Sequence, residues 1–595
     1  MAEYAEKQNT KISRCLVEAL SVLKESSLEA VDSPELQSSF TEYMHIDREV
    51  QKEFWNIVQY VADSEEAQLI LLCGSVGDGK SHILSYYTKN EPETMVKFKI
   101  HNDSTASYYK NKPAIETLKE TLAGFSDEQI ATSKEKWIIA INLGTLTNFL
   151  NGDTENRFTK LRDYVKQQNI LDNTIPEERT DMSGNFHCVN FSDYHLYTLK
   201  DEKVKSTYIQ SIFKKITDDT EDNIFNQAYK NNCMDCPNKN KCPVKANYEM
   251  LKNETVQTML IESLIEAIIK GKIILSTRSI FDFIYELLVD RRYINDSSSM
   301  IRTTIENLNV DQYVNTLLPN TLFSHDDGKG IFAALSACDP LNIKNKEVDD
   351  LVIKVLNNAN IISLIDEKIP ELNGSLNKLR NIDFSEPSKQ ELNKTCLKLY
   401  IRASKLFNRN HELKLQDELY TSFLKDLYYW NKSYNVRLKD LYEVTQKAML
   451  VWNGEAPKGA MRLNVGKHQM NYVISQEVRI KPCINNSNQK PETELTKFLE
   501  EINLVYQDKD GDRQSNTYQI LIDYNLYKLI YSMRDGYKPN RKDKNLYVKF
   551  DDFVNQVEDS GSQHEMLIIE EKNRKNPRQY EFSYGDFGFT FEVKK

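Results

Sequence analysis

The chain has 595 residues, of which 40% are hydrophobic and 28% are charged, an ordinary composition for a globular protein. A chain of this length is too long for one core, so we expect about three or four domains. The net charge of −11 excludes a global positive field that would attract nucleic acid. Any contact with nucleic acid must therefore come from local basic patches or from a partner chain.

Apolar runs and cysteines indicate the compartment. No run of about 18 apolar residues, the length of a membrane-spanning helix, occurs in the sequence. The first fifteen residues, MAEYAEKQNTKISRC, lack the apolar centre of a secretory signal. The nine cysteines are an odd number scattered over a long chain, which favours reduced thiols over a disulfide framework. We expect a cytoplasmic protein without a membrane partner.

Two helical patterns open the chain. Residues 1–45 contain one amphipathic segment, ISRCLVEALSVLKE, and a polar linker, and we treat them as an N-terminal helical segment. A second helix, HIDREVQKEFWNIVQYV, then leads into the apolar run AQLILLC. That run reads as a short strand buried on both faces of a parallel sheet.

A glycine-rich loop follows this strand directly. Residues 74–81, GSVGDGKS, fit G-x-x-x-x-G-K-[ST] at every fixed position, and the next segment, SHILSYYTKN, has helical spacing. Strand, loop and helix are the context in which backbone N–H groups converge on the phosphates of a nucleotide. Lys80 would contact the γ-phosphate and the Ser81 hydroxyl would bind Mg²⁺. A glycine-rich turn without a ligand is the alternative. The expected nucleotide contacts are Gly74, Ser75, Val76, Gly77, Asp78, Gly79, Lys80, Ser81 and His82.

Further strands are predicted at βαβ spacing, separated by helical segments such as AIETLKETLAGF and TVQTMLIESLIEAIIKG. They lie in residues 94–105, 136–150, 186–194 and 272–288, which gives a set of about five with the first strand. The predicted fold is an α/β P-loop NTPase core, a parallel sheet with helices on both faces, over residues 46–300.

The carboxylate expected beside Mg²⁺ has no obvious candidate in the usual place. The strand KWIIAIN ends in Asn142, which resembles a polar sensor of the γ-phosphate and offers no anionic ligand. Asp103, after KFKIHN, is the better candidate and Asp193 the next, although Asp103 is equally well explained as an exposed turn residue. Arg278, before an amphipathic helix, is placed to contact phosphate, and a surface arginine is the alternative.

Three cysteines stand close together in a polar segment, with the spacing Cys233-x2-Cys236-x5-Cys242. Thiolates in short loops can converge tetrahedrally on Zn²⁺. For the fourth ligand we expect Cys188 or His187, with His195 as a weaker choice. A metal-free loop and an iron–sulfur cluster are the alternatives. We interpret about residues 181–250 as an insertion in the sheet that a structural metal holds together.

The remaining chain divides into two parts. Residues 301–450 have helical spacing, whereas residues 451–595 mix strands with the helix YNLYKLIYSM, which predicts a helical domain and an α+β C-terminal domain. Basic residues gather at 538–544 and 572–578 in turn-rich segments. They could contact phosphates or could be solvated ends of hairpins.

Several motifs together resemble one family of bacterial defence proteins. In chain order they are LLCGSVGDGKSH, IHNDST, AINLGTL, C-x2-C-x5-C-P, LSTRSIFDF, YIRASKLF, MLVWNGEAPKG and MRDGYKP. The chain is similar in these to the DptF (DndF) family, the P-loop component of a DNA phosphorothioation-dependent restriction system. The resemblance spans most of the chain, although the motifs after residue 300 are less specific.

The resemblance implies an ATP-using subunit that acts with DptG-like and DptH-like partners on DNA that lacks a sulfur-modified backbone. It places nucleotide contacts on Gly74, Gly79, Lys80 and Ser81, whereas Asn142 departs from the usual carboxylate. No complete nuclease centre is recognised, so DNA cleavage would belong to a partner. Double-stranded DNA would be bound directly or through partners, and homo-oligomerisation stays open. Two other functions remain as alternatives: an assembly subunit that binds ATP with little turnover, and an ATPase of another defence system.

Overall fold

The structure is a computed structural model that describes most of the chain. The described residues are 15–28, 40, 42–75, 78–102, 114–171, 183–293, 297–324, 330–357, 360–456, 459–463, 471–484, 491–508, 516–561, 566–571, 579–585 and 587–594. The chain divides into two compact units, the first holding most of residues 1–416 and the second most of residues 417–595.

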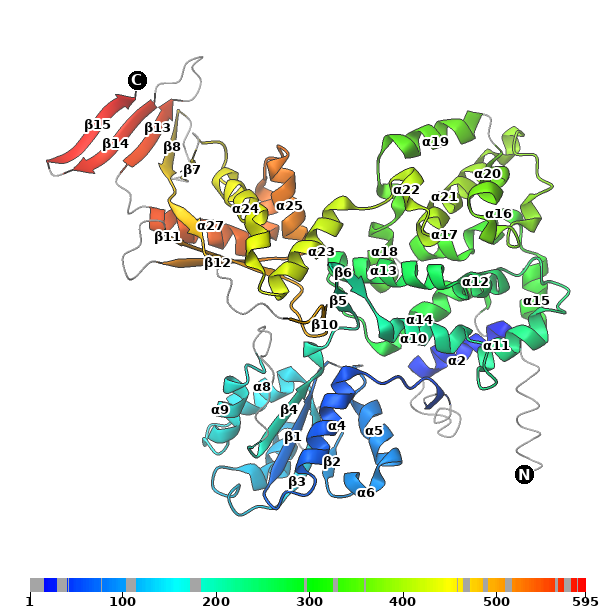
Figure 1. The fold of residues 1–595 in the computed structure, drawn as a ribbon, viewed down its shortest axis with the longest axis horizontal. Coiled ribbons are helices and arrows are strands. Elements are labelled where there is room, and N and C mark those ends of the chain that lie inside the picture. The colour runs from blue at the N-terminus through cyan, green and yellow to red at the C-terminus, as the bar shows by residue number, and fades with distance from the viewer. Residues whose placement is uncertain are drawn as a thin grey trace. The chain divides into compact units, whose positions relative to one another are not determined.

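A parallel sheet forms the centre of the first part of the chain (Figure 1). In spatial order its described strands are β2 (Lys99–His101), β3 (Lys136–Ile141), β1 (Gln68–Cys73) and β4 (Phe186–Asn190). Strand β1 pairs in parallel with both β3 and β4, and all six of its residues are buried. A strand buried on both faces has no polar side, which explains the continuous apolar run in its sequence. The expected α/β core is confirmed at this level.

Helices cover both faces of the sheet, as the alternation of side chains along β1 requires. Ile70 and Leu72 pack in one core cluster with helices α4 (Glu49–Val61), α5 (Lys80–Asn90) and α6 (Pro92–Met95). Leu69 and Leu71 pack in a second cluster with α7 (Ala114–Thr121), α8 (Leu143–Asn151) and α9 (Thr159–Gln167). The sheet is therefore the middle layer of three.

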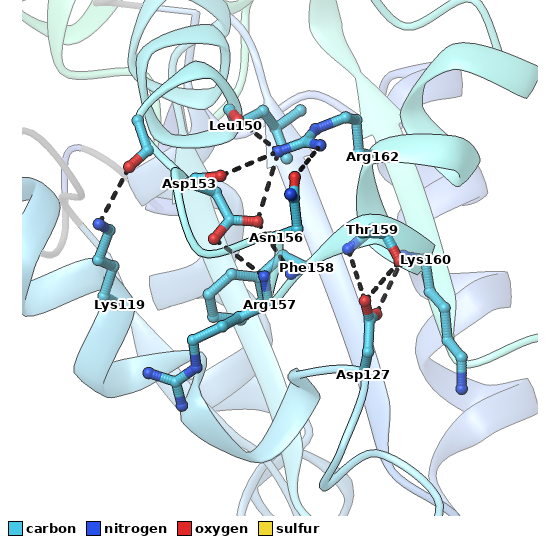
Figure 2. Close-up of polar contacts among 11 residues, drawn as sticks. Lys119, Asp127, Leu150, Asp153, Asn156, Arg157, Phe158, Thr159, Lys160 and Arg162 are labelled. Carbon is cyan, nitrogen blue, oxygen red and sulfur yellow. Dashed lines mark hydrogen bonds and ion pairs between the residues drawn. The ribbon is translucent and has the colours of Figure 1, made fainter.

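Two carboxylates, the buried Asp153 and the partly exposed Asp127, fix the turn between α8 and α9 (Figure 2). Asp153 accepts hydrogen bonds from the backbone N–H groups of Arg157 and Phe158, and Arg162 donates to its carboxylate at 3.4 Å. Asp127 accepts from the backbone and hydroxyl of Thr159 at the start of α9. Burial opposes ionisation of Asp127, but these hydrogen bonds outweigh it and lower the pKa of that carboxyl.

The predicted fifth strand is wrong. Residues 273–276 are irregular and link α13 (Glu254–Gly271) to α14 (Thr277–Leu288). In the segment KIIL, the apolar residues after Lys272 favour a strand locally, but α13 continues to Gly271 and a capping box at Ser276 starts α14. The side chain of Ile274 is left 84% exposed. The cysteine segment therefore follows the parallel sheet along the chain and does not interrupt it.

The rest of the first unit is helical. Its described helices are α2 (Leu16–Leu28), α10 (Thr207–Thr217), α11 (Ile224–Ala228), the π-helical turn η3 (Tyr229–Cys233), α12 (Pro243–Leu251), α15 (Ser298–Glu306), α16 (Val310–Asn315), α17 (Leu318–Phe323), α18 (Gly330–Ala337), α19 (Lys346–Asn357), α20 (Ile361–Lys368), α21 (Gln390–Leu406) and α22 (Asn410–Leu413). Helix α21 carries buried ion pairs from Arg402 to Asp339 at 2.5 Å and from Lys405 to Glu266 at 2.9 Å.

The second unit combines helices with antiparallel sheets. Its described helices are α23 (Glu418–Asn431), α24 (Lys439–Val451), α25 (Tyr524–Arg534), α26 (Arg541–Leu546) and α27 (Val548–Gly561). One sheet has the order β12 (Thr517–Ile522), β11 (Ile502–Asp508), β9 (Ile480–Pro482), and another the order β15 (Gly588–Lys594), β14 (Gln579–Gly585), β13 (Met566–Glu571), β8 (Tyr472–Glu477), β7 (Ala460–Arg462).

A small further sheet has the order β10 (Glu494–Leu495), β5 (Thr198–Lys200), β6 (Lys203–Lys205). Among the described helices, none combines the length and the apolar character needed to cross a membrane.

Candidate functional site

The carboxyl edge of the parallel sheet brings the candidate residues together. Gly74 follows β1, Asn142 follows β3, and Asn190 ends β4, and these three strands are neighbours in register. In open α/β sheets, ligands bind beyond the carboxyl ends of the strands. The glycine loop leaves the central strand of this group, so it lies at the usual ligand-binding edge.

Two glycines shape the loop for different reasons. A Cβ atom on Gly74 would lie 2.8 Å from the Cβ of Phe191, so only glycine fits where the loop passes β4. Gly79 has a φ of 96° in the left-handed region and precedes the first residue of α5. Val76 and Gly77 lie outside the described residues.

The charged residues of the loop contact its own backbone. Lys80 Nζ donates to the carbonyl oxygens of Gly74 at 2.8 Å and Ser75 at 2.6 Å. The carboxylate of Asp78 accepts from the backbone N–H of Ser75 at 2.6 Å. Burial raises the pKa of Asp78 above its ordinary value, against the effect of that hydrogen bond. Ser81 is exposed in the first turn of α5, where backbone N–H groups have no acceptor within the helix.

Arg48 is a contact of the loop that the sequence did not reveal. Its Nη1 donates to the carbonyl oxygen of Asp78 at 3.0 Å, and its guanidinium lies 5.2 Å from the ring centroid of Tyr208. The Tyr208 hydroxyl in turn hydrogen-bonds Thr277 Oγ1 at 2.8 Å. A continuous set of contacts therefore joins the glycine loop to the first residue of α14.

Arg48 also lines a cavity of about 140 Å³. Its walls mix aromatic rings with hydroxyl groups, and three charged side chains, those of Asp47, Arg48 and Glu49, also line it. The lining residues are 46–50, 194–198, 206–208, Ser211 and Thr496. Because Arg48 belongs to both, the cavity adjoins the glycine loop.

Two histidines meet beside the loop. His82 Nε2 and His45 Nδ1 are 2.9 Å apart, and the His45 ring stacks on Tyr86 with a centroid distance of 3.8 Å. Burial and the neighbouring His45 lower the pKa of His82 to about 4, and burial lowers the pKa of His45. Both rings are therefore neutral near pH 7, and one can accept a hydrogen bond from the other.

The other described residues that the sequence predicted for the site lie near strand ends and at the start of α14. Asn142 follows the strand beside β1, as expected, but its Oδ1 accepts from the backbone N–H of Thr145 at 2.6 Å and so caps α8. Asp193 accepts from Asn190 at 2.8 Å. Arg278 lies in the first turn of α14, next to Thr277. Asp103 lies outside the described residues.

The expected fourth metal ligand is not with the other cysteines. Cys188 is buried in the sheet core with its sulfur 3.7 Å from that of Cys73. His187 contacts Gln68 at 2.7 Å, and His195 contacts the carbonyl oxygen of Phe498 at 2.9 Å. In contrast, Cys233 ends η3 and Cys242 precedes α12. Cys188 was expected because of its nearness in sequence, and the structure places it on a core strand against Cys73.

The described part of the chain contains no preformed metal centre. No group of three or more His, Cys, Asp and Glu side chains is arranged there so that it could hold an ion. All nine cysteines lie among the described residues, and none of them forms a disulfide bond.

Comparisons with family models, with curated proteins and with solved structures gave no match to this chain. What the site does must therefore be inferred from its own residues.

Proposed function

We propose that this chain binds ATP with Mg²⁺ at residues 74–82 and acts as the ATP-hydrolysing subunit of a DNA phosphorothioation-dependent restriction complex. One observation carries the nucleotide part of this proposal: a buried central strand ends in a glycine loop with Lys80 folded over it, at the start of α5. A cationic side chain and helix N–H groups meet there, which is the chemistry that a phosphate chain requires.

When the phosphates bind, Lys80 would change its hydrogen-bond acceptors. Lys80 Nζ, which now donates to the carbonyls of Gly74 and Ser75, would donate to phosphate oxygens. The first N–H groups of α5 supply further donors, and the positive end of the helix dipole favours the negative charge. The exposed Ser81 hydroxyl would bind Mg²⁺, which neutralises charge on the phosphates.

The adjoining cavity is suited to the rest of the nucleotide. Tyr194, Tyr197 and Tyr208 offer aromatic surface in its walls, and a planar base stacks well on such rings. Arg48 stands between the cavity and the loop, so it would contact both parts of a bound nucleotide.

The same contacts would relay the state of the nucleotide. Arg48 holds the Asp78 carbonyl, and Tyr208 connects Arg48 to Thr277 at the start of α14. A change in loop conformation after hydrolysis would reach α14 along this route and bring Arg278, the next residue, toward or away from the phosphates. Contacts that exist with only one nucleotide state bias a two-state arrangement in this way.

Hydrolysis needs a carboxylate that the strand next to β1 does not provide. Asp103 follows strand β2 in the sequence. Because β3 lies between β2 and β1, the strands β2 and β1 are about 10 Å apart. We propose that Asp103 supplies this carboxylate. The capping role of Asn142 favours a second function, an assembly subunit that binds ATP with little turnover.

The role in restriction rests on the family resemblance. The described basic segment does not favour direct DNA contact, because Lys538 pairs with Glu455 at 2.7 Å and Lys544 contacts Asn453 at 2.5 Å. The second basic segment, residues 572–578, lies outside the described residues. We therefore propose that DptG-like and DptH-like partners carry DNA contact and cleavage.

Calorimetry with ATP and Mg²⁺ tests the binding site. Wild type and Lys89→Ala should bind ATP, whereas Lys80→Ala should bind at least tenfold more weakly. Lys89 is the matched control because it lies at the other end of α5 and pairs with Glu42. Equal binding by Lys80→Ala and wild type would refute the site.

Turnover and restriction are measured separately. A wild type that binds ATP but hydrolyses it no faster than Lys80→Ala would favour the assembly function. If the chain and its partners, with ATP, degrade unmodified and phosphorothioated plasmids equally, the proposed restriction role is wrong.

A further inference from the structure

One face of the five-stranded sheet in the second unit is apolar. Side chains alternate between the two faces of a sheet along each strand, and residues that pair across two strands share a face. Phe582 of β14 pairs with Phe591 of β15. Tyr580 of β14 pairs with Val593 of β15 on one side and with Ile569 of β13 on the other. The face that these pairs define, which we call the apolar sheet face, includes Ile569, Tyr580, Phe582, Phe589, Phe591 and Val593.

The apolar sheet face is exposed along β15, the edge strand of the sheet (Figure 1). Phe589 is 71% exposed, and Phe591 and Val593 are each 59% exposed. Phe587, in the turn that joins β14 to β15, is fully exposed. Among the described helices, none packs extensively against β13, β14 or β15, whereas α24 packs against β7 at the opposite edge. The described helices therefore leave this face uncovered.

The exposed rings are fixed by stacking on their neighbours. Phe591 stacks on Tyr580 with ring centroids 5.1 Å apart. Phe589 stacks on Phe582, also with centroids 5.1 Å apart. Stacking of this kind stabilises a ring pair beyond the burial of its area. The rings therefore lose little conformational freedom when a partner covers them, which favours association.

The opposite face of the β14–β15 hairpin is polar. The hydroxyl groups of Ser583 and Thr590 form a hydrogen bond of 2.7 Å across the two strands. Glu581 lies directly opposite Glu592. In an antiparallel sheet with one face in water, the polar face is the solvated one and the apolar face packs on a core. The apolar sheet face is therefore the side of this hairpin that requires a cover.

The chemistry of the apolar sheet face excludes partners that are bound through their negative charge. Nucleic acid and anionic lipid require clustered cations, and the six named side chains of this face carry no charge. Glu571, whose carboxylate accepts from the Tyr580 hydroxyl at 3.4 Å, adds a negative charge at its border. The partner must therefore present an apolar surface. A second sheet face meets this requirement, because two sheets pack face to face about 10 Å apart with interdigitating side chains.

The exposed area is of the size that a dimer needs. A fully exposed aromatic side chain offers about 200 Å², so Phe587, Phe589 and Phe591, with Val593 and the half-buried rings, offer roughly 600–800 Å². The largest apolar patch on a typical monomer is about 300–600 Å², whereas a stable interface covers about 800 Å² on each partner. A second copy of the same face would match this area.

We propose that two copies of this chain form a dimer in which their apolar sheet faces pack against each other about a twofold axis. In such an interface each residue is used twice, once by each copy. Homodimer interfaces are also more apolar than other protein interfaces, which agrees with the composition of this face. Dimerisation through this face does not depend on nucleotide binding at residues 74–82.

Analytical ultracentrifugation of the full chain at micromolar concentrations tests the proposal. Wild type should be a dimer that dissociates on dilution. The double variant Phe589→Thr, Phe591→Thr keeps residues that favour a strand, and its dissociation constant should rise by at least about 100-fold, because twofold symmetry removes each ring twice. Glu592→Gln is the matched control on the polar face of the same strand, and its dissociation constant should stay within about twofold of wild type.

Two results of the ultracentrifugation would overturn the proposal. One is a wild type that is monomeric at these concentrations, including one that instead binds neutral lipid vesicles or another protein. The other is a double variant, folded as judged by circular dichroism, that dimerises as tightly as wild type, since the two copies would then meet through another surface.

Hydroxyl-radical footprinting of wild type guards against a variant that fails to fold. Labelling of Phe589 and Phe591 should increase when the dimer is diluted to monomer, because their rings become exposed to solvent. Tyr60, which is 61% exposed in the first unit, is the internal control and should be labelled equally in both states. Equal labelling of Phe589 and Phe591 in dimer and monomer would place the interface elsewhere and overturn the proposal.

Discussion

Replacement of Arg48 by alanine tests whether this residue holds the glycine loop. The guanidinium donates to the Asp78 carbonyl at 3.0 Å and lies over the rings of Tyr208 and Phe191 at 5.2 and 5.8 Å. A hydrogen bond from a charged donor contributes about 1.5–3 kcal/mol, and a cation–π contact at a partly exposed site about 0.5–1 kcal/mol. Of these free energies, only the part that differs between the free loop and the nucleotide-bound loop affects the affinity for ATP.

If the hydrogen bond to Asp78 accounts for this difference in free energy, Arg48→Ala should weaken ATP binding by about 10- to 100-fold. This follows because about 1.4 kcal/mol corresponds to a tenfold change in affinity. Arg48→Lys keeps the charge but loses the planar group that stacks on the rings, so an intermediate loss is expected. Calorimetry with ATP and Mg²⁺ measures both. Lys52→Ala is the control, because Lys52 lies on the exposed side of α4, the helix that Arg48 precedes, and pairs with Glu49 at 2.8 Å.

The reasoning fails if Arg48→Ala, folded as judged by circular dichroism, binds ATP within twofold of wild type. It also fails if Lys52→Ala is weakened as much, because the effect would then come from general charge and not from the loop contact.

Three other changes give distinct outcomes. Asp78→Asn should bind ATP about fivefold more tightly in calorimetry, because it removes about 1 kcal/mol of repulsion from phosphate while its amide oxygen can still accept from Ser75; weaker binding would contradict this. The low pKa of His82, about 4 against 6.5 when unfolded, means that the unfolded chain takes up the proton first as pH falls. Stability to urea should therefore drop between pH 6.5 and 4 by up to about 3 kcal/mol, and His82→Gln should flatten that drop. Arg402→Ala leaves Asp339 buried without its cation and should cost about 3–5 kcal/mol in urea unfolding, whereas exposed Lys394→Ala should cost under about 1 kcal/mol.

Local sequence patterns predicted a strand correctly where the hydrophobic pattern matches the burial of that strand in the fold. The run QLILLC is apolar throughout because both faces of β1 are covered, and the glycine loop starts where that strand ends. The run KIIL shows the opposite case. Its β-branched residues favour a strand, yet the two flanking helices leave it only a short connection with Ile274 exposed. The flanking helices α13 and α14, and not the strand propensity of this segment, therefore determine its conformation.

Long-range contacts escaped prediction because they leave no local pattern. Arg48 is thirty positions before Asp78 and follows no motif, so only the fold shows that it touches the loop. Helix α2 likewise packs against η3, more than two hundred residues later, whereas Cys188 is nearer to Cys233 in sequence but belongs to a strand in the core. Spacing identifies candidate ligands within one loop, but it does not show which distant segment packs against that loop.

The loop is held from three sides before any ligand arrives. Phe191, after β4, leaves room only for glycine at position 74, Arg48 holds the Asp78 carbonyl, and Lys80 bonds the first two carbonyls. Of these, only the Lys80 contacts must be given up when phosphate binds, since Arg48 and Phe191 touch other atoms. A loop that is largely arranged in advance loses little conformational entropy on binding. The affinity for ATP should then depend on the exchange that Lys80 makes and on how well Arg48 holds the loop in its binding conformation beforehand. The response of the rest of the chain should depend on whether Arg48 keeps its contact with the Asp78 carbonyl after hydrolysis.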